Sequence, residues 1–299
     1  MKLGVVILNY KSYDMTLACL SQIENLRLIN DIVVVDNNSP NESYKELKRA
    51  QQGHRWHLLQ SGTNRGYSSG NNIGIRYLME HTKADIIGIV NPDVSFDDDF
   101  LRQIHEAFAV DDEYAVLTGV QHRKDGTISN RSFWPELTRW TTIRANLWLI
   151  NKLANYRSEH NMHFIHKVLQ RATQKKIVEV PVVEGCCFFV RRSVWDEIGL
   201  LDERIFLFFE EDILAHKVHD KGWKIGILPQ APFLHDHSTT IKSVYSNLQS
   251  EFISLESRGK FYRNYLSRGL LDNLAYNLSV AIFYIEKCVL IPYHWILKK

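Results

Sequence analysis

The chain has 299 residues, of which 45% are hydrophobic and 23% are charged, a composition that excludes a disordered polypeptide and allows one large folded domain. The net charge of +2 is unevenly distributed. Residues 137–176 carry eight Lys and Arg against one acid, residues 239–299 carry eight against four, and the remainder has a net charge of −9. This pattern excludes a nucleic-acid-binding surface spread over a whole domain. It indicates two basic segments that either face anionic groups, such as lipid headgroups or phosphates, or are simply solvated.

The four cysteines form neither a CxxC pair nor a zinc-ligand pattern, which favours a reduced, cytosolic compartment. The N-terminal apolar run ends at Asn9 and is too short for a signal peptide. Near the C-terminus, residues 279–297 are interrupted by Glu286 and Pro292, so they are not predicted to span a membrane. Their aromatic content and the final lysines are typical of a helix at a membrane interface, and equally compatible with a helix packed on the body.

Apolar runs typical of buried strands alternate with helical patterns along the chain. Strands are predicted at residues 3–8, 32–35, 56–59, 86–90, 115–120 and 225–228. Helices are predicted at residues 13–28, 42–51, from a glycine-rich loop to about 80, at 98–110, and from 210 to the stop at Gly222. Residues 137–176 are predicted to be a basic helical insertion. The alternation predicts an α/β fold with a mostly parallel sheet flanked by helices.

Polar residues follow the predicted strands at the points where ligands bind in such folds. They are Asn9-Tyr10, Asp36-Asn37, the segment 64–72 and Asn91-Pro92-Asp93. All four groups are expected at one edge of the sheet. The first strand leads into NYKSYD and not into GxGxxG, so the phosphate loop of a dinucleotide-binding fold is missing.

Each strand-end motif has a ligand interpretation and a structural one. Asp36 is placed to accept hydrogen bonds from a ribose or a base. The loop 63–74 contains three glycines and three asparagines, which suit close approach to an anion or sugar but also occur in ordinary turns. Asp93 could hold the Mg²⁺ or Mn²⁺ of a nucleotide diphosphate, or it could belong to an Asx-Pro turn.

A second acidic site follows the apolar run 206–209. Glu211 and Asp212 are adjacent carboxylates, which are costly to bury unless they serve chemistry or are neutralised. The alternative is that they open a helix, where negative charge suits the N-terminal dipole. Farther along, His235 and His237 could complete a metal site or be a surface pair.

In this order, the segments resemble the inverting nucleotide-sugar glycosyltransferases of family 2, and among them the bacterial rhamnosyltransferase-like group. The matching segments are VVILNYKS, IVVVDNNS, TNRGYSSGNNIGI, IVNPDV, EGCCFFVRRSVWDEIGLLDERIFLFFEED, GWKI and the region from His235 to Ser238. The resemblance covers residues 1–240 and implies a nucleotide-binding fold of the GT-A type with a single-displacement reaction. Residues 241–299 would be a helical, basic and aromatic tail.

The resemblance also implies roles for residues. The donor-binding residues are expected to be Asn9, Tyr10, Asp36, Asn64, Gly66, Asn71 and Asp93. The metal, Mg²⁺ or Mn²⁺, is expected at Asp93 and His235. Asp212 matches the catalytic base, with Glu211 beside it.

The acceptor side is expected to include Arg131, Glu184 and Gly185.

The chain departs from the family pattern in two places. Asn91 stands where the first Asp of the Asp-x-Asp element is usual, and Leu214 stands where many relatives have a further acid.

The sequence therefore predicts an inverting transfer of a sugar, with rhamnose from dTDP-rhamnose as the candidate donor, to a saccharide acceptor that is lipid-linked, in bacterial cell-surface polysaccharide synthesis. The enzyme would be cytoplasmic, in peripheral contact with the inner face of the membrane. The alternatives are a non-catalytic nucleotide-sugar-binding protein and a family 2 transferase that uses a UDP-hexose. Truncation after about Asn247 is expected to spare donor hydrolysis and to impair transfer to a lipid-linked acceptor.

Overall fold

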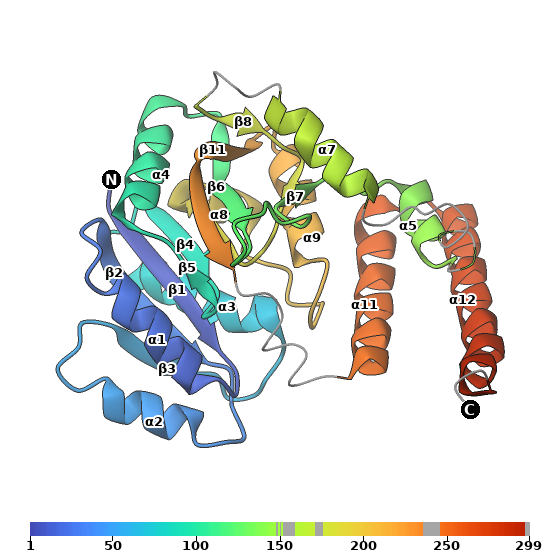
Figure 1. Ribbon diagram of the computed structural model, residues 1–299, viewed down its shortest axis with the longest axis horizontal. Coiled ribbons are helices and arrows are strands. Elements are labelled where there is room, and N and C mark those ends of the chain that lie inside the picture. The colour runs from blue at the N-terminus through green and yellow to red at the C-terminus, as the bar shows by residue number, and fades with distance from the viewer. Residues whose placement is uncertain (148, 150, 152–158, 171–175, 236–245, 297–299) are drawn as a thin grey trace.

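The fold is that of a computed structural model, which describes residues 1–147, 149, 151, 159–170, 176–235 and 246–296. The N-terminal half alternates strands and helices (Figure 1). Its elements are β1 (Leu3–Asn9), α1 (Tyr13–Ile23), β2 (Ile29–Asp36), α2 (Ser43–Ala50), β3 (His57–Gln60), α3 (Tyr67–His81), β4 (Ile86–Val90), β5 (Val94–Ser95), α4 (Asp98–Val110) and β6 (Tyr114–His122). The predicted alternation is confirmed, although the helix predicted to reach residue 28 ends at Ile23 and leaves room for the longer β2.

The second half adds short strands, the helices around the site and a helical tail. Its elements are β7 (Phe133–Trp134), α5 (Arg139–Ala145), α7 (Glu159–Gln170), β8 (Val178–Glu179), β9 (Val182–Val183), β10 (Cys187–Arg191), α8 (Arg192–Ile198), α9 (Glu210–Asp220), β11 (Lys224–His235), α11 (Asn247–Phe261), the π-helical turn η1 (Tyr262–Leu266) and α12 (Leu270–Ile296). The basic insertion predicted at 137–176 thus contains α5 and α7 within its described residues.

Within the described residues, one large mixed sheet has the strand order β3-β2-β1-β4-β10-β6-β11-β5. The first four strands pair in parallel, β10 pairs antiparallel with both β4 and β6, and β11 runs parallel to β6. The short β5 follows β4 in the chain but pairs antiparallel with the end of β11. This arrangement brings the carboxyl ends of β1, β2 and β4 to the same edge as the end of β11.

Both faces of the sheet are covered, as the continuous apolar runs of the strands require. In β1, Val5 and Ile7 belong to the cluster that packs on α1, α2 and α4, and Val6 belongs to the cluster that packs on α3, α8 and α9. Alternate residues of a strand point to opposite faces, so one strand serves two cores. The sheet is therefore a rigid platform for the loops at its edge.

The tail stands beside this body on the side of α9, with α11 and α12 next to each other in Figure 1. Lys287 of α12 pairs with Glu251 of α11 at 2.7 Å. Phe261, at the end of α11, joins Ile205 and Ile213 of the body in a small apolar cluster. None of the helices described is long and apolar enough to cross a membrane.

Candidate active site

A cavity of about 220 Å³ opens at the predicted edge of the sheet. Its wall includes, among the sequence-predicted residues, Tyr10, Asn64, Gly66, Asp93, Arg131, Glu184, Gly185, Glu211 and His235. Residues from both halves of the chain thus meet at one place. Four of the predicted donor residues, both predicted metal ligands and the predicted acceptor-side residues share this wall.

Four predicted site residues are buried and do not line the cavity: the donor residues Asn9, Asp36 and Asn71 and the catalytic candidate Asp212. Asp36 is fully buried and accepts hydrogen bonds from Asn9 Nδ2 at 2.7 Å and from the Ser39 N–H at 3.0 Å. Asn71 is buried inside α3, where its Nδ2 donates to the carbonyl of Tyr67. Asn9 and Asp36 therefore hold the ends of β1 and β2 together. Asn37, which the sequence placed at this strand end without a donor-binding role, lines the cavity instead.

The glycine-rich loop is held against the loop that precedes α9 by a close backbone contact. Gly66 has φ +100°, and a Cβ added there would lie 2.1 Å from the carbonyl oxygen of Phe206. That oxygen accepts from the N–H of Tyr67 at 2.9 Å. Only glycine fits this position, for reasons of both φ and space. The loop that precedes α9 is thereby fixed to the start of α3.

The segment before α9 has an unusual backbone. Phe208 and Phe209 both have φ +69°, a left-handed conformation that costs non-glycine residues free energy and is concentrated at functional sites. Phe206 and Phe208 line the cavity, whereas the Phe209 ring lies 5.8 Å from that of Phe261 in α11. The aromatic side chains before α9 therefore face two places: Phe206 and Phe208 line the cavity, and Phe209 packs on the tail.

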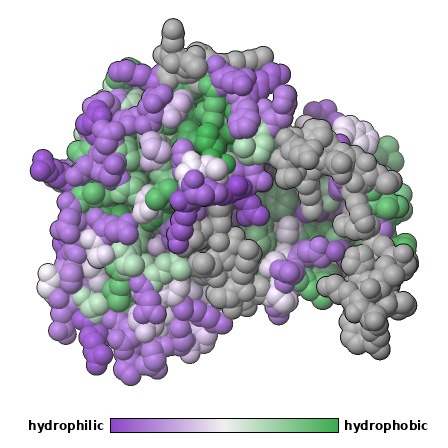
Figure 2. Space-filling view, viewed as in Figure 1, coloured by the Kyte–Doolittle hydropathy of each residue, from purple (hydrophilic) through white to green (hydrophobic). Residues whose placement is uncertain are grey.

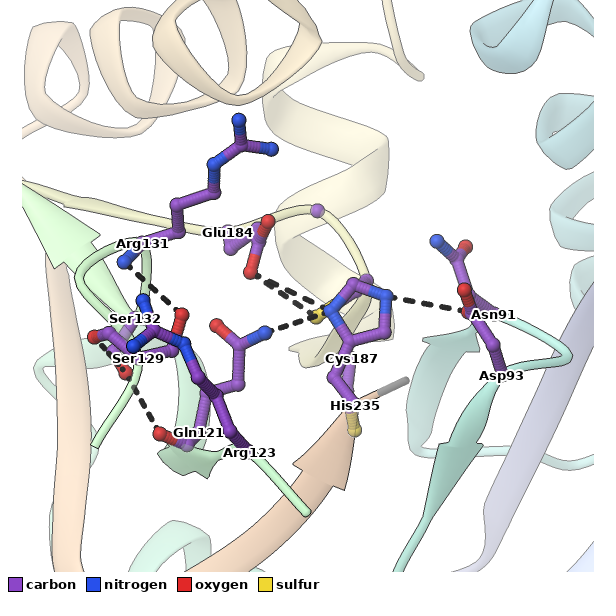
Figure 3. A network of polar contacts seen from close by, with 12 residues as sticks. Asn91, Asp93, Gln121, Arg123, Ser129, Arg131, Ser132, Glu184, Cys187 and His235 are labelled. Atoms are coloured by element: carbon purple, nitrogen blue, oxygen red, sulfur yellow. Dashed lines mark hydrogen bonds and ion pairs between the residues drawn. The ribbon is translucent and has the colours of Figure 1, made fainter. Parts of the chain in front are cut away.

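The imidazole of His235 lies between the carboxylates of Asp93 and Glu184, and each of these residues comes from the end of a different strand (Figure 3). Asp93 lies in the three-residue link between β4 and β5, and His235 ends β11. His235 Nε2 is 3.2 Å from Asp93 Oδ1, and Nδ1 is 3.7 Å from Glu184 Oε2 and 2.7 Å from Gln121 Nε2. Burial would lower the pKa of His235, but its hydrogen bonds and charge interactions with Asp93 and Glu184 outweigh burial and raise it to about 9.

The atoms around His235 are of the kinds that bind divalent cations. Ligand atoms of Glu184, Cys186 and His235 lie within 4.8 Å of one another, and Asp93 adds a further oxygen on the other side of the ring. Carboxylate oxygen and imidazole nitrogen suit Mn²⁺ and Mg²⁺, whereas the thiol of Cys186 suits softer ions. The predicted pair Asp93 and His235 is thus brought together, while His237 lies outside the described residues.

The three acids that begin α9 point in different directions. Glu210 and Glu211 line the cavity, and Glu211 Oε1 accepts from the Gly185 N–H at 3.1 Å. Asp212 is not on the cavity wall, and its Oδ1 accepts from Trp134 Nε1 at 3.1 Å. Burial raises the pKa of Glu210 and of Asp212 to about 7 each, and that of Glu211 well above its usual range.

Tyr67 is a site residue that the sequence analysis missed. Its hydroxyl lies 2.6 Å from the Gly185 carbonyl and 3.1 Å from Asn91 Oδ1, so it ties two walls of the cavity together. The signal was its place directly after Gly66, at the first position of α3. Asn91, which belongs to the predicted strand-end group and departs from the family pattern, accepts a hydrogen bond from the Tyr67 hydroxyl. A second carboxylate at this position would add negative charge to the site.

Comparison with known proteins agrees with this architecture. A sequence model of glycosyl transferase family 2 matches residues 4–199, more than half of the chain. The low-salt glycan biosynthesis hexosyltransferase Agl10 of Haloferax volcanii is 26% identical over 278 residues, which are 93% of this chain and 78% of that protein. An N-acetylglucosaminyl-diphospho-decaprenol L-rhamnosyltransferase of Mycobacterium tuberculosis is 27% identical over 198 residues, 61% of this chain and 60% of that protein.

Solved structures have the same fold. The mannosyltransferase PcManGT of Pyrobaculum calidifontis, in complex with GDP-Man and Mn²⁺, aligns with a TM-score of 0.55 at 13% identity and covers 99% of this chain and 80% of its own. GalNAc-T7 with UDP, GalNAc and Mn²⁺ aligns with a TM-score of 0.58 at 13% identity and covers 98% of this chain and 58% of its own. The predicted GT-A type fold is thus confirmed. The chain belongs to glycosyl transferase family 2 and is a glycosyltransferase that acts on nucleotide sugars.

Proposed function

We propose that the protein is an inverting hexosyltransferase that moves a sugar from a nucleotide-diphosphate donor to a lipid-linked saccharide in the synthesis of a bacterial cell-surface polysaccharide. Rhamnose from dTDP-rhamnose is the first candidate donor, because a mycobacterial relative is by its name an L-rhamnosyltransferase that acts on N-acetylglucosaminyl-diphospho-decaprenol. The observation that carries the proposal is one cavity lined both by the Asp93–His235 pair and by two acids of α9, Glu210 and Glu211.

The residues fit a divalent cation at the donor diphosphate. Asp93 Oδ1 and His235 Nε2 are 3.2 Å apart, about the separation of two neighbouring ligands that each lie roughly 2.1 Å from one ion. Asp93 and His235 would hold Mg²⁺ or Mn²⁺, and Glu184 would face the other nitrogen of the His235 ring. The cation would supply positive charge to stabilise the departing diphosphate.

The acids of α9 supply the base. In an inverting transfer, the oxygen of the acceptor hydroxyl attacks the anomeric carbon of the donor sugar, and the bond from that carbon to the nucleotide diphosphate breaks. A carboxylate takes the proton of the acceptor hydroxyl in the same step. Of the two candidates, Asp212 and Glu211, the cavity favours Glu211, because only Glu211 lines it. Burial raises the pKa of Glu211 and so increases its basicity. Asp212 then orients the start of α9 through Trp134.

The acceptor side of the proposal rests on Arg131, Glu184 and Gly185, which line the same cavity. A lipid-linked acceptor would place the enzyme in the cytoplasm against the inner face of the cell membrane. Arg131 brings a permanent positive charge to a wall rich in acids, and this charge suits an acceptor or donor phosphate.

A donor screen tests the proposal. Purified protein is heated with dTDP-rhamnose, UDP-hexoses or GDP-mannose, each with Mn²⁺ and with EDTA, and a true donor should raise the melting temperature in the presence of the cation only. Asp93→Ala should remove both the stabilisation and its Mn²⁺ dependence. NMR of the product should show an inverted anomeric configuration. Stabilisation without hydrolysis or transfer would favour the non-catalytic binding protein, and a response to UDP-hexoses alone would replace rhamnose as the donor sugar.

A further inference from the structure

The outer side of α12 bears a row of exposed apolar side chains. Leu271, Leu274, Leu278, Ile285 and Val289 are 81%, 54%, 63%, 63% and 64% exposed. Their spacing of three, four and seven residues places them on one face of the helix. We call this row the α12 strip, and it is about 27 Å long at a rise of 1.5 Å per residue. In Figure 2, apolar residues gather at the outer edge of the α11–α12 region, on the right of the view.

The charged residues of α12 between Leu270 and Val289 are engaged elsewhere. Asp272 pairs with Arg139 of α5 at 2.8 Å. Glu286 accepts from the backbone N–H of Leu149 at 3.2 Å, and Lys287 pairs with Glu251. The strip is therefore free of charge along its length, which is unusual for a solvent-facing helix of a monomer.

The surroundings of the strip are basic and aromatic. Arg263 and Arg268 are exposed just before α12, and among the described residues neither guanidinium has an acidic partner within ion-pair distance. Trp140, next to the Arg139 that pairs with α12, is 71% exposed. A row of leucines flanked by arginines and an exposed indole is the composition of helices that lie in the interface of a bilayer.

We propose that the α12 strip docks on an anionic lipid bilayer, with the apolar side chains at the boundary of headgroups and acyl chains and the arginines among the headgroup phosphates. Charge complementarity favours a bilayer over a second copy of the chain, because residues 239–299 carry a net charge of +4 and two such tails would repel each other. The role of this surface rests on the proposed function: it would hold the cavity beside a lipid-linked acceptor.

Vesicle flotation tests the surface directly. Full-length protein should float at low salt with vesicles of phosphatidylglycerol and phosphatidylethanolamine, and much less with phosphatidylcholine alone. The double variant Leu274→Ser with Leu278→Ser should bind at least about tenfold more weakly. Val110→Ser is the matched control, since Val110 is 79% exposed at the end of α4 and belongs to the body. Equal binding by the double variant and the wild type, or no binding by either, overturns the proposal.

Light scattering and donor hydrolysis separate the remaining outcomes. A wild-type dimer that the double substitution converts to monomer would assign the strip to self-association and overturn the bilayer. The double variant should hydrolyse the donor as the wild type does but lose transfer to a vesicle-embedded acceptor about tenfold. If the protein floats with vesicles but hydrolyses no nucleotide sugar, the docking surface is supported and the proposed function is overturned. If the protein hydrolyses a donor but does not float, the docking surface is overturned and the proposed function is supported.

Discussion

At the scale of single residues, the proposal depends on which carboxylate, Glu211 or Asp212, is the base that takes the proton of the acceptor hydroxyl. Glu211→Gln should lower turnover by about 10²–10⁴-fold while leaving donor affinity nearly unchanged, because it removes the base and keeps the shape. Asp212→Asn should cost much less, since an amide oxygen can still accept from Trp134 Nε1. Steady-state rates with donor binding by calorimetry measure both effects. The reverse order of losses would return the role of base to Asp212, as the sequence alone suggested.

Gly66 offers a second test at this scale. Gly66→Ala should lower the free energy of unfolding by about 1–3 kcal/mol and disturb donor binding, because both its φ and the Phe206 carbonyl exclude a Cβ. Gly62→Ala is the matched control, since a Cβ there would meet nothing within 4 Å. Denaturant unfolding of both variants measures the difference. Equal stabilities would mean that the loop before α9 moves away easily.

At the scale of elements, the start of α9 links pH to stability. Burial raises the pKa of Glu210 from 4.5 to about 7, so the folded state keeps a proton that the unfolded state has released. Stability should therefore fall as the pH rises from about 4.5 to 7, and the full cost should remain above pH 7. Glu210→Gln lacks this cost and should gain stability relative to the wild type at pH 8 compared with pH 5.

Urea unfolding of the wild type and Glu210→Gln at the two pH values measures this difference. Glu80→Gln, at an exposed position of α3, controls for the loss of one carboxylate. Curves that shift in parallel with pH for wild type and Glu210→Gln would show that the Glu210 carboxyl does not take up a proton on folding.

Sequence patterns were sufficient for the alternating strands and helices of the N-terminal half and for much of the cavity wall, because strand ends converge by topology. The same patterns missed the short strands β5, β7, β8 and β9 and the antiparallel pairing of β10. They could not decide which acid of α9 faces the cavity. Neighbouring helical residues point about 100° apart, so the answer depends on the rotation of the helix. Here that rotation is set by the left-handed Phe208 and Phe209 and by the distant contact between Gly66 and Phe206. Asn9 and Asp36 were similarly placed at the right edge but turned toward each other.

At the scale of the whole molecule, the tail contacts the loop that precedes α9. Ser257 Oγ of α11 donates to the Leu207 carbonyl at 2.8 Å, and the Arg258 guanidinium lies 5.6 Å from the centre of the Phe209 ring. Truncation after Asn247 should therefore abolish donor hydrolysis, in contrast to the expectation from the sequence. Truncation after Gly269, which removes α12 and keeps α11, should reduce it far less. Hydrolysis at the wild-type rate by the shorter protein would show that α11 is dispensable for the site.

The path of the chain through the sheet also determines when the site can exist. Asp93 reaches His235 because β5 pairs with the end of β11, and these strands are far apart in sequence. Long loops must close before such a pairing forms, which makes it a late event. During refolding, Mn²⁺ uptake measured by electron paramagnetic resonance should therefore lag behind the far-ultraviolet circular dichroism of the helices. Simultaneous signals would place this sheet edge among the first structures to form. If the lag is found, cation binding marks the completion of folding, and a chain still too short to include His235 would lack one of the two proposed cation ligands and so could not bind a donor in the cation-dependent way.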